Sequence, residues 1–324
     1  MNDILFWIIF NVFVLLLLGL DLFVFHRKEH EVKIKEALLW SLFWILLSLG
    51  FNLLIYYWRG PAPALEFLTG YLIEKSLSVD NLFVFIMIFS YFKVPLKFQH
   101  KILFWGIIGA LVLRAIFIVV GVALIAKFHF IIYILGLFLV FTGIKMAFSH
   151  GDEEVHPENN PLVSWVSKHI RITKQPVGGK FFTKIDGKWF ATPLFLVLIM
   201  VESTDVVFAA DSIPAILAIS KDPFIVYTSN VFALLGLRAL YFALAGIMQL
   251  FHYLHYGLSV ILVFIGAKLL LSDVVEIDMR YALLVVGAIL AISVIASLLF
   301  PKKPEELPEP PIKDEPENKK IVNP

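Results

Sequence analysis

The stretch LVLIMVESTDVVFAADSIPAI, residues 196–216, places carboxylates inside a run that is otherwise almost wholly apolar. A related stretch, SLSVDNLFVF at residues 76–85, carries Asp80 where VESTDVVFAA at 201–210 carries Asp205. An apolar run of about 20 residues can cross a bilayer as a helix. Both stretches belong to runs of at least this length, so they predict membrane helices with an acidic residue near the middle.

The composition of the whole chain also favours a membrane protein. Of 324 residues, 60% are hydrophobic and 16% charged, and the mean hydropathy is +0.86. Soluble domains are nearer half apolar and a quarter charged, which argues against an ordinary soluble enzyme and a disordered chain. The net charge of +1 leaves no basic excess for nucleic acid. The absence of cysteine excludes disulfides and thiolate sites.

Nine apolar segments are long enough to span a bilayer, which predicts an all-α polytopic membrane helix bundle. They are residues 4–25, 36–58, 65–92, 102–126, 128–149, 192–219, 224–248, 253–272 and 279–300. Asp186-Gly187 predicts a tight hairpin turn in the loop 150–191. The residues after 300 are rich in Pro, Glu and Lys, which predicts a disordered tail at 301–324.

Basic residues in the connecting segments predict the orientation in the membrane. One side collects 18 Lys and Arg and the other side 4. Basic loops stay in the cytoplasm, so we expect the N-terminus outside and the C-terminus in the cytoplasm. A plasma (inner) membrane location fits this distribution.

Three charged landmarks recur at nearly constant spacing. The paired residues are Asp80 and Asp205, Arg114 and Arg238, and Lys145 and Lys268, which lie 125, 124 and 123 residues apart. Each copy covers three predicted helices, in domains 65–149 and 192–272. These follow two N-terminal helices in 1–58 and precede a last one in 279–300. Because three is odd, the second copy enters the membrane from the opposite side, which predicts an inverted 3+3 repeat with a midplane site.

The acidic residues inside the spans are the predicted cation ligands. A charge at the bilayer centre costs roughly 2.5–3.5 kcal/mol on insertion scales, so these groups should face the bundle interior. The predicted ligands are Asp80, Asp205, Glu74, Glu202, Asp211 and Asn81, with support from Ser78, Ser203, Thr204 and Ser212. Arg114 and Arg238 are predicted counter-charges that hold the vacant acidic site together. A purely structural pairing of these arginines with the aspartates is the alternative.

The spacing of the acids also predicts broken helices. Glu74 and Asp80 are six residues apart, as are Asp205 and Asp211, so on a straight helix each pair diverges by about 120°. Pro214 would supply a break in the second copy, freeing backbone carbonyls as further ligands. Oxygen ligands without thiolate or histidine favour Mg²⁺, Mn²⁺ or Ca²⁺.

At this point the chain resembles a known family. GYLIEKSLSVDNLFVF, GALVLRAIF, FTGIKMAF, LVLIMVESTDVVFAADSIPAI and LLGLRALYF together resemble the TerC family of inner-membrane proteins, and its Alx-like branch in particular, over roughly residues 35–275. The family is named for tellurium resistance, and its members are implicated in manganese export and, in the Alx branch, in alkaline stress. The resemblance implies Mn²⁺ efflux, with the family's acidic motifs on Glu74, Asp80, Asn81, Glu202, Asp205 and Asp211.

We therefore expect a transporter rather than an enzyme, one that exports Mn²⁺ in exchange for protons by alternating access. Its partners would be the metal cation, protons and the lipid bilayer, without nucleic acid and without a tightly bound cofactor. One alternative is a scaffold or sensor in metal, pH or tellurium stress that transports nothing. The other is an intramembrane hydrolase, although the sequence lacks the G-x-S-x-G and H-E-x-x-H motifs.

Overall fold

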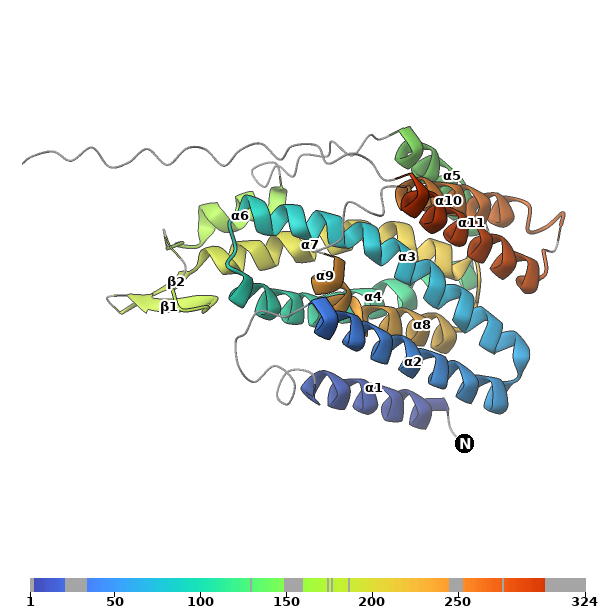
Figure 1. The fold of residues 1–324 in the computed structure, drawn as a ribbon, viewed down its shortest axis with the longest axis horizontal. Coiled ribbons are helices and arrows are strands. Elements are labelled where there is room, and N and C mark those ends of the chain that lie inside the picture. Colours follow the sequence, from blue (N-terminus) through green and yellow to red (C-terminus); the bar gives the residue numbers. More distant parts are fainter. Residues whose placement is uncertain are drawn as a thin grey trace, which may run out of the picture.

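The computed structural model describes residues 3–20, 34–128, 130–148, 160–173, 175, 177–185, 187–244, 253–275 and 277–300, and it is mostly helical. In chain order the elements are α1 (Asp3–Leu20), α2 (Ile34–Arg59), α3 (Pro61–Tyr91), α4 (Leu96–Lys127), α5 (Ile131–Phe148), α6 (Pro161–His169), β1 (Phe182–Ile185), β2 (Lys188–Ala191), α7 (Pro193–Leu217), α8 (Pro223–Leu235), α9 (Leu237–Leu244), α10 (Leu254–Leu270) and α11 (Met279–Leu299). Most of the long helices run along one another, and the two strands lie at one end (Figure 1). The predicted tail, residues 301–324, lies outside the described residues.

The helices have the length and composition of a polytopic membrane protein. Six described segments are long and apolar enough to cross a bilayer: Lys35–Arg59, Leu96–Lys127, Ile131–Phe148, Pro193–Leu217, Pro223–Leu244 and Arg280–Leu299. Each of the nine predicted spans overlaps a helix, but Leu5–Gly19 and Leu254–Leu270 are short. Helix α3 is long, yet its apolar run is interrupted by the charged residues Glu66, Glu74, Lys75 and Asp80. A count of nine spans therefore stays a prediction.

The predicted breaks in the two acidic helices are not present, so this expectation was wrong. Helices α3 and α7 each run without interruption, and Pro214 lies inside α7. A proline removes the backbone bond to the residue four positions earlier. Because α7 ends three residues after Pro214, at Leu217, little helix remains to be displaced. An interruption does occur farther along the chain, at Gly236 between α8 and α9.

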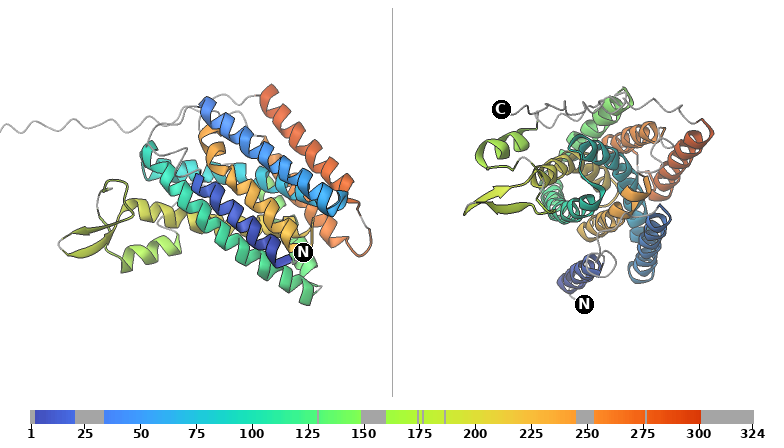
Figure 2. Two further views of the ribbon diagram at one scale, coloured as in Figure 1. Left: turned by 90° about the horizontal axis from the view of Figure 1, so that it is seen from below. Right: turned by 60° about the vertical axis from the view of Figure 1, so that its left-hand side comes forward.

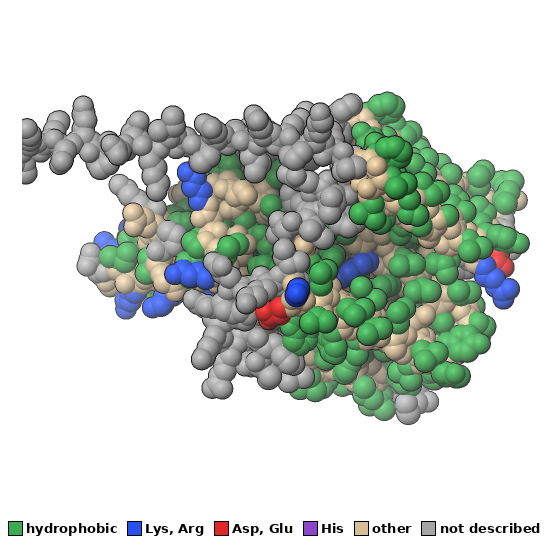
Figure 3. Space-filling view, in the orientation of Figure 1, with side chains coloured by type: hydrophobic (Ala, Val, Ile, Leu, Met, Phe, Trp, Pro, Cys, Tyr) green, Lys and Arg blue, Asp and Glu red, His purple; other side chains and the backbone are tan. Residues whose placement is uncertain are grey.

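The centre of the bundle is built from four helices. Helix α3 packs against α7 and α8, and helix α4 also packs against α7 and α8. Around this centre, α2 lies on α3 and α9, α11 lies on α3 and α10, and α5 pairs along α10. Large apolar side chains such as Leu15, Leu39 and Phe141 are exposed on the outside, as lipid contact requires. The described body is accordingly green over much of its surface (Figure 3).

Two turns at the end away from the hairpin are fixed by their sequence. Gly60 has a φ of 96°, a conformation that favours glycine, and it lets the chain reverse between α2 and α3. Asp222 caps α8 by accepting hydrogen bonds from the backbone N–H groups of Phe224 and Ile225. Arg59 donates to the same carboxylate at 2.5 Å, so the two turns are tied together.

A side arm leaves the bundle at its other end. Strands β1 and β2 pair antiparallel, with Ile185 opposite Lys188 across the predicted Asp186-Gly187 turn. Helix α6 packs on α7 through the buried Val163 and Val166. Both views in Figure 2 show α6 and the hairpin extending sideways from the long helices, and the right-hand view sees those helices nearly end-on.

Candidate functional site

A single arginine joins four polar side chains at the centre of the bundle. Arg114 of α4 is buried, and its Nη1 donates to the Glu74 carboxylate of α3 and, at 2.9 Å, to the Asn230 side-chain oxygen of α8. From α7, Asp205 Oδ1 accepts from Nη2 at 3.3 Å and Ser212 accepts from Nη1 at 3.2 Å. The guanidinium therefore holds together the four helices that form the centre of the fold.

The cluster accounts for the burial of every charge in it. Glu74 is 0% exposed and Asp205 is 2% exposed, depths at which an unpaired carboxylate would be very costly. Asn230 also donates from Nδ2 to Glu74 Oε2 at 3.3 Å, so both oxygens of that carboxylate are bonded. A planar guanidinium with five donors suits such a shared role better than an ammonium group does.

The charges and the hydrogen bonds of this cluster are nevertheless incomplete. With both carboxylates ionised, Glu74, Asp205 and Arg114 sum to one negative charge. Asp205 Oδ2 and Arg114 Nε are buried and have no hydrogen-bond partner among the described residues. Buried polar atoms are normally paired. The remaining negative charge and the unpaired carboxylate oxygen would therefore allow the cluster to take up one proton or one further cation.

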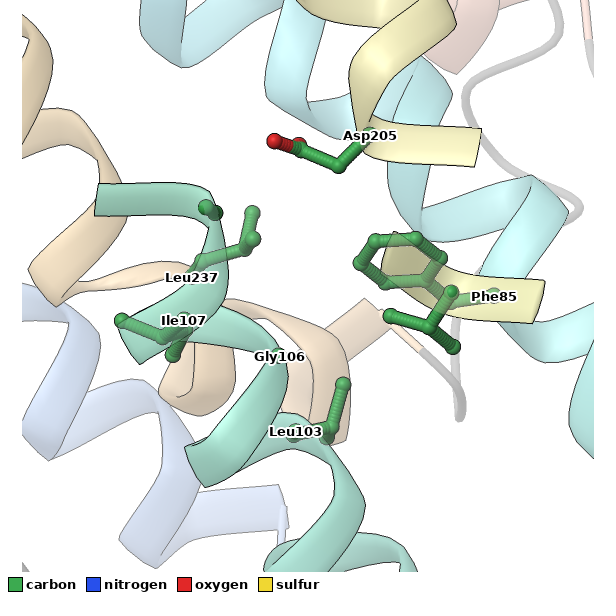
Figure 4. A pocket seen from close by; sticks show the side chains of 8 residues that line it. Phe85, Leu103, Gly106, Ile107, Asp205 and Leu237 are labelled. Atoms are coloured by element: carbon green, nitrogen blue, oxygen red, sulfur yellow. The ribbon is translucent and has the colours of Figure 1, made fainter. Parts of the chain in front are cut away.

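A water-sized cavity opens beside Asp205. About 10 Å³ is open to the centre of a water molecule, close to the minimum that one water needs. It is lined by Phe85, Leu103, Gly106, Ile107, Ala110, Val201, Asp205 and Leu237. Figure 4 shows the Asp205 carboxylate pointing into this space from α7. Gly106 of α4, which has no side chain, lies across the space from it. Asp205 is the only charged residue among those lining residues.

Glu202 lies one turn before Asp205 on the same helix and is half-buried. A Cβ on Gly109 of α4 would overlap the Glu202 carboxylate, so the glycine leaves the room in which this side chain sits. The neighbouring hydroxyls are engaged elsewhere, since Ser203 and Thr204 both donate to the Met200 carbonyl, at 2.9 and 2.7 Å. Of these three predicted residues, Glu202 is the one placed next to the cluster.

Asp211 is separated from Asp205, as the spacing on a straight helix predicts. It lies beside the hydroxyl of Thr142 and the charge of Lys145, both on α5. In this structure it belongs to the contact between α7 and α5 rather than to the Arg114 cluster. The next residue, Ser212, does bond Arg114.

The remaining predicted residues have different outcomes. Asn81, Ser78 and Arg238 are buried in their helices, and the Ser78 hydroxyl has no partner among the described residues. Asp80 is part of α3, but its side chain lies outside the described residues.

Asn230 was missed by sequence reasoning. Its signal was the polar triplet Thr-Ser-Asn at 228–230 within an apolar helix.

The structure places no group of three or more His, Cys, Asp or Glu side chains around one point within its described ranges. The carboxylates of Glu74 and Asp205 instead share a guanidinium. The site as described is therefore an acidic pair closed by an internal cation.

Comparison with known proteins agrees with the fold and the motifs. The model of the integral membrane protein TerC family matches residues 59–305. An uncharacterised membrane protein of Myxococcus xanthus is 50% identical over 293 residues, which cover 90% of this chain and 92% of the relative. Proteins of Shigella flexneri and Escherichia coli K12, provisionally named membrane-bound redox modulator Alx, are each 50% identical over 298 residues, which cover 89% of this chain and 93% and 92% of the two relatives. No solved structure matches the chain. The protein belongs to the TerC family of integral membrane proteins.

Proposed function

We propose that the protein is a secondary transporter that moves a divalent cation, Mn²⁺, out of the cytoplasm in exchange for protons. The observation that carries this proposal is the buried acidic pair of Glu74 and Asp205. One arginine binds both carboxylates, and with both of them ionised the cluster keeps one negative charge. Asp205 Oδ2 has no hydrogen-bond partner among the described residues. Such a pair can hold a proton in one state and a cation in another. Intramembrane ionisable groups of this kind mark ion pathways in transporters.

The ligand chemistry supports a hard cation. Carboxylate, hydroxyl and amide oxygens come together from Glu74, Asp205, Ser212 and Asn230 around the guanidinium. Oxygen sets of this type suit Mn²⁺, Mg²⁺ and Ca²⁺. In the proposal the guanidinium of Arg114 occupies the cation site when no metal is bound, and the arriving ion displaces it from the carboxylates. The choice of Mn²⁺ within the three ions rests on the family resemblance.

The packing of α5 against α10 supports an inverted repeat. A shift of 123 residues maps Gly136, Val140 and Gly143 of α5 onto Ser259, Val263 and Gly266 of α10. A Cβ on Gly143 would lie 2.8 Å from both the Ser259 carbonyl oxygen and Val263. A Cβ on Gly266 would lie 2.7 Å from the Gly136 carbonyl oxygen and 2.8 Å from Val140. The two sets of contacts are therefore equivalent under the 123-residue shift, as expected if α5 and α10 are corresponding helices of two repeats.

The central helices show the same correspondence. In the proposed repeat α3 corresponds to α7 and α4 to α8, so the contact between α3 and α8 is equivalent to the contact between α7 and α4. Both contacts are extensive. Two copies related in this way, with opposite orientations in the membrane, provide inward and outward access by rocking against each other. The N-out, C-in orientation and the inner-membrane location remain part of this proposal.

A redox role would need another mechanism. Some relatives are named as redox modulators, which suggests a redox role. This chain, however, has no cysteine. Thiol–disulfide exchange through its own side chains is therefore excluded. An influence on cellular redox state would follow indirectly from control of the free metal ion.

The test is transport by purified protein in liposomes, with a manganese-sensitive dye and a pH dye read together. Wild-type protein should carry Mn²⁺ and move protons in the opposite direction. Asp205→Asn and Glu74→Gln should abolish both signals. Asp273→Asn, which changes an exposed carboxylate in the loop after α10, should leave them intact. Equal flux in all four proteins would refute the site, and no flux in the wild type would favour a scaffold or sensor.

A further inference from the structure

The side arm carries apolar side chains on its free surface. In α6, Leu162 and Trp165 are exposed while Val163 and Val166 face α7. Trp165 is 57% exposed. A soluble amphipathic helix would turn such residues inward, so this face of α6 lacks a partner within the described chain.

The hairpin repeats this feature. Trp189 of β2 is 68% exposed, and Ile185 of β1 is exposed as well. Trp189 lies directly opposite Lys184 in the sheet, so one face presents an indole and an ammonium group side by side. Tryptophan with an adjacent basic residue is typical of the boundary between lipid headgroups and acyl chains.

The arm is strongly basic. Its exposed cations are Lys168, Arg171, Lys180, Lys184 and Lys188. Over residues 160–191 the sequence has six basic residues and a single acid, Asp186. Figure 3 shows Lys and Arg side chains gathered at the hairpin end, in contrast to the green helical body. The surface therefore complements negative charge.

Hydrogen bonds and a ring contact help to attach the arm to the bundle. Lys101 of α4 donates to the Gly179 carbonyl at 2.9 Å, and the Phe182 ring packs on Phe195 of α7 at 4.5 Å between centroids. Asn160, the N-cap of α6, donates to the Ser203 hydroxyl of α7 at 2.7 Å. These contacts hold the arm beside the bundle at the level where the long helices end (Figure 2). In a membrane, this is the level of the lipid headgroups of one leaflet.

From position, exposed apolar side chains and charge, we propose that α6 and the β1–β2 hairpin bind anionic phospholipid headgroups of that leaflet. Trp165, Leu162 and Trp189 enter the interface, and the lysines and arginine contact the phosphates. Basic residues near an anionic surface contribute about 1 kcal/mol each, which is about a fivefold change in binding per residue. Because the arm is held in place, little conformational entropy is lost on binding. The proposal is independent of transport.

The experiment uses the full chain in nanodiscs that hold one copy each. Since the chain has no cysteine, a single Cys at the exposed His169 of α6, which lies on the same helix face as Trp165, can be spin-labelled without other changes. Accessibility to an aqueous nickel chelate and to lipid-soluble oxygen is then compared in phosphatidylcholine and in phosphatidylcholine with phosphatidylglycerol. The label should become shielded from nickel in the anionic discs, and high salt should reverse the change.

Charge variants separate lipid binding from folding. The arm variant combines Lys180→Gln, Lys184→Gln and Lys188→Gln. At about fivefold per residue, the three changes together should lower the ratio of lipid-bound to unbound arm on the order of 100-fold. The matched control combines Lys127→Gln, Lys221→Gln and Arg280→Gln, exposed cations outside the arm, and should change nothing. Equal accessibility in both lipids would overturn the proposal. So would shielding that survives the arm variant, or that appears only with two copies in a disc, which would indicate an interface between copies.

Discussion

Replacing Arg114 by methionine tests the central cluster most directly. The change keeps the length of the apolar stem and removes the guanidinium that bonds Glu74, Asp205, Ser212 and Asn230. Two carboxylates would then be buried without a counter-charge. Breaking a buried ion pair by removing one partner typically costs about 3–5 kcal/mol. We therefore expect Arg114→Met to be destabilised by about that amount in detergent at neutral pH.

Metal should reverse much of this loss if the guanidinium occupies the cation site. Ligand that binds only the folded state stabilises it by about 2.7 kcal/mol at 100 times its dissociation constant. Arg114→Met should therefore gain more thermal stability from added Mn²⁺ than the wild type, in which ion and arginine compete. The assay is thermal unfolding of the purified protein across a Mn²⁺ titration, with and without the metal chelated.

A double-mutant cycle identifies the origin of the effect. Glu74→Gln added to Arg114→Met removes one of the two uncompensated charges, and it should recover part of the lost stability while weakening the response to metal. The reasoning is refuted if Arg114→Met unfolds like the wild type. It is also refuted if the variant is destabilised but gains no more from Mn²⁺ than the wild type does.

Three further outcomes are expected. In the proposed inverted repeat Arg238 and Asp80 correspond to Arg114 and Asp205, so the double variant Arg238→Met with Asp80→Asn should be more stable than Arg238→Met alone, measured by thermal unfolding; additive losses would contradict the pairing. Gly109→Val should displace the Glu202 carboxylate and reduce Mn²⁺ flux severalfold with little loss of folded protein, and unchanged flux would remove Glu202 from the pathway. Gly266→Leu should push α10 from α5 and cost about 1–3 kcal/mol or more in unfolding measurements, whereas Gly287→Leu, at an open position, should cost far less.

The sequence predicted those features that depend on local pattern. Helices 36–58 and 279–300 were found because a bilayer selects for long apolar runs, and the structure places α2 and α11 there within two residues. Burial of Arg114 as a counter-charge to the acidic residues was also expected, because isolated charges cannot be left in hydrocarbon. Which acid completes the cluster was not predictable from spacing alone, since Glu74 comes from another helix.

Two errors have a common physical cause. The predicted breaks in α3 and α7 assumed that Asp205 and Asp211 must reach one ion, and the straight helix instead sends Asp211 to Thr142 and Lys145. Asn230 was missed because its role depends on the packing of α8 against α3. In both cases the site is determined by contacts between helices far apart in the chain, and a one-dimensional pattern does not contain them.

The geometry of Arg114 explains how a small ion could move large helices. The guanidinium bonds side chains of three other helices at once, so its release from Glu74 and Asp205 would loosen α3, α4, α7 and α8 together. A lysine at this position has three donors on a single nitrogen and lacks the planar fork that reaches all four partners. If an ion replaces the guanidinium, binding energy is converted into altered helix contacts, as alternating access requires. Arg114→Lys should therefore preserve the charge but weaken the coupling between Mn²⁺ binding and helix rearrangement.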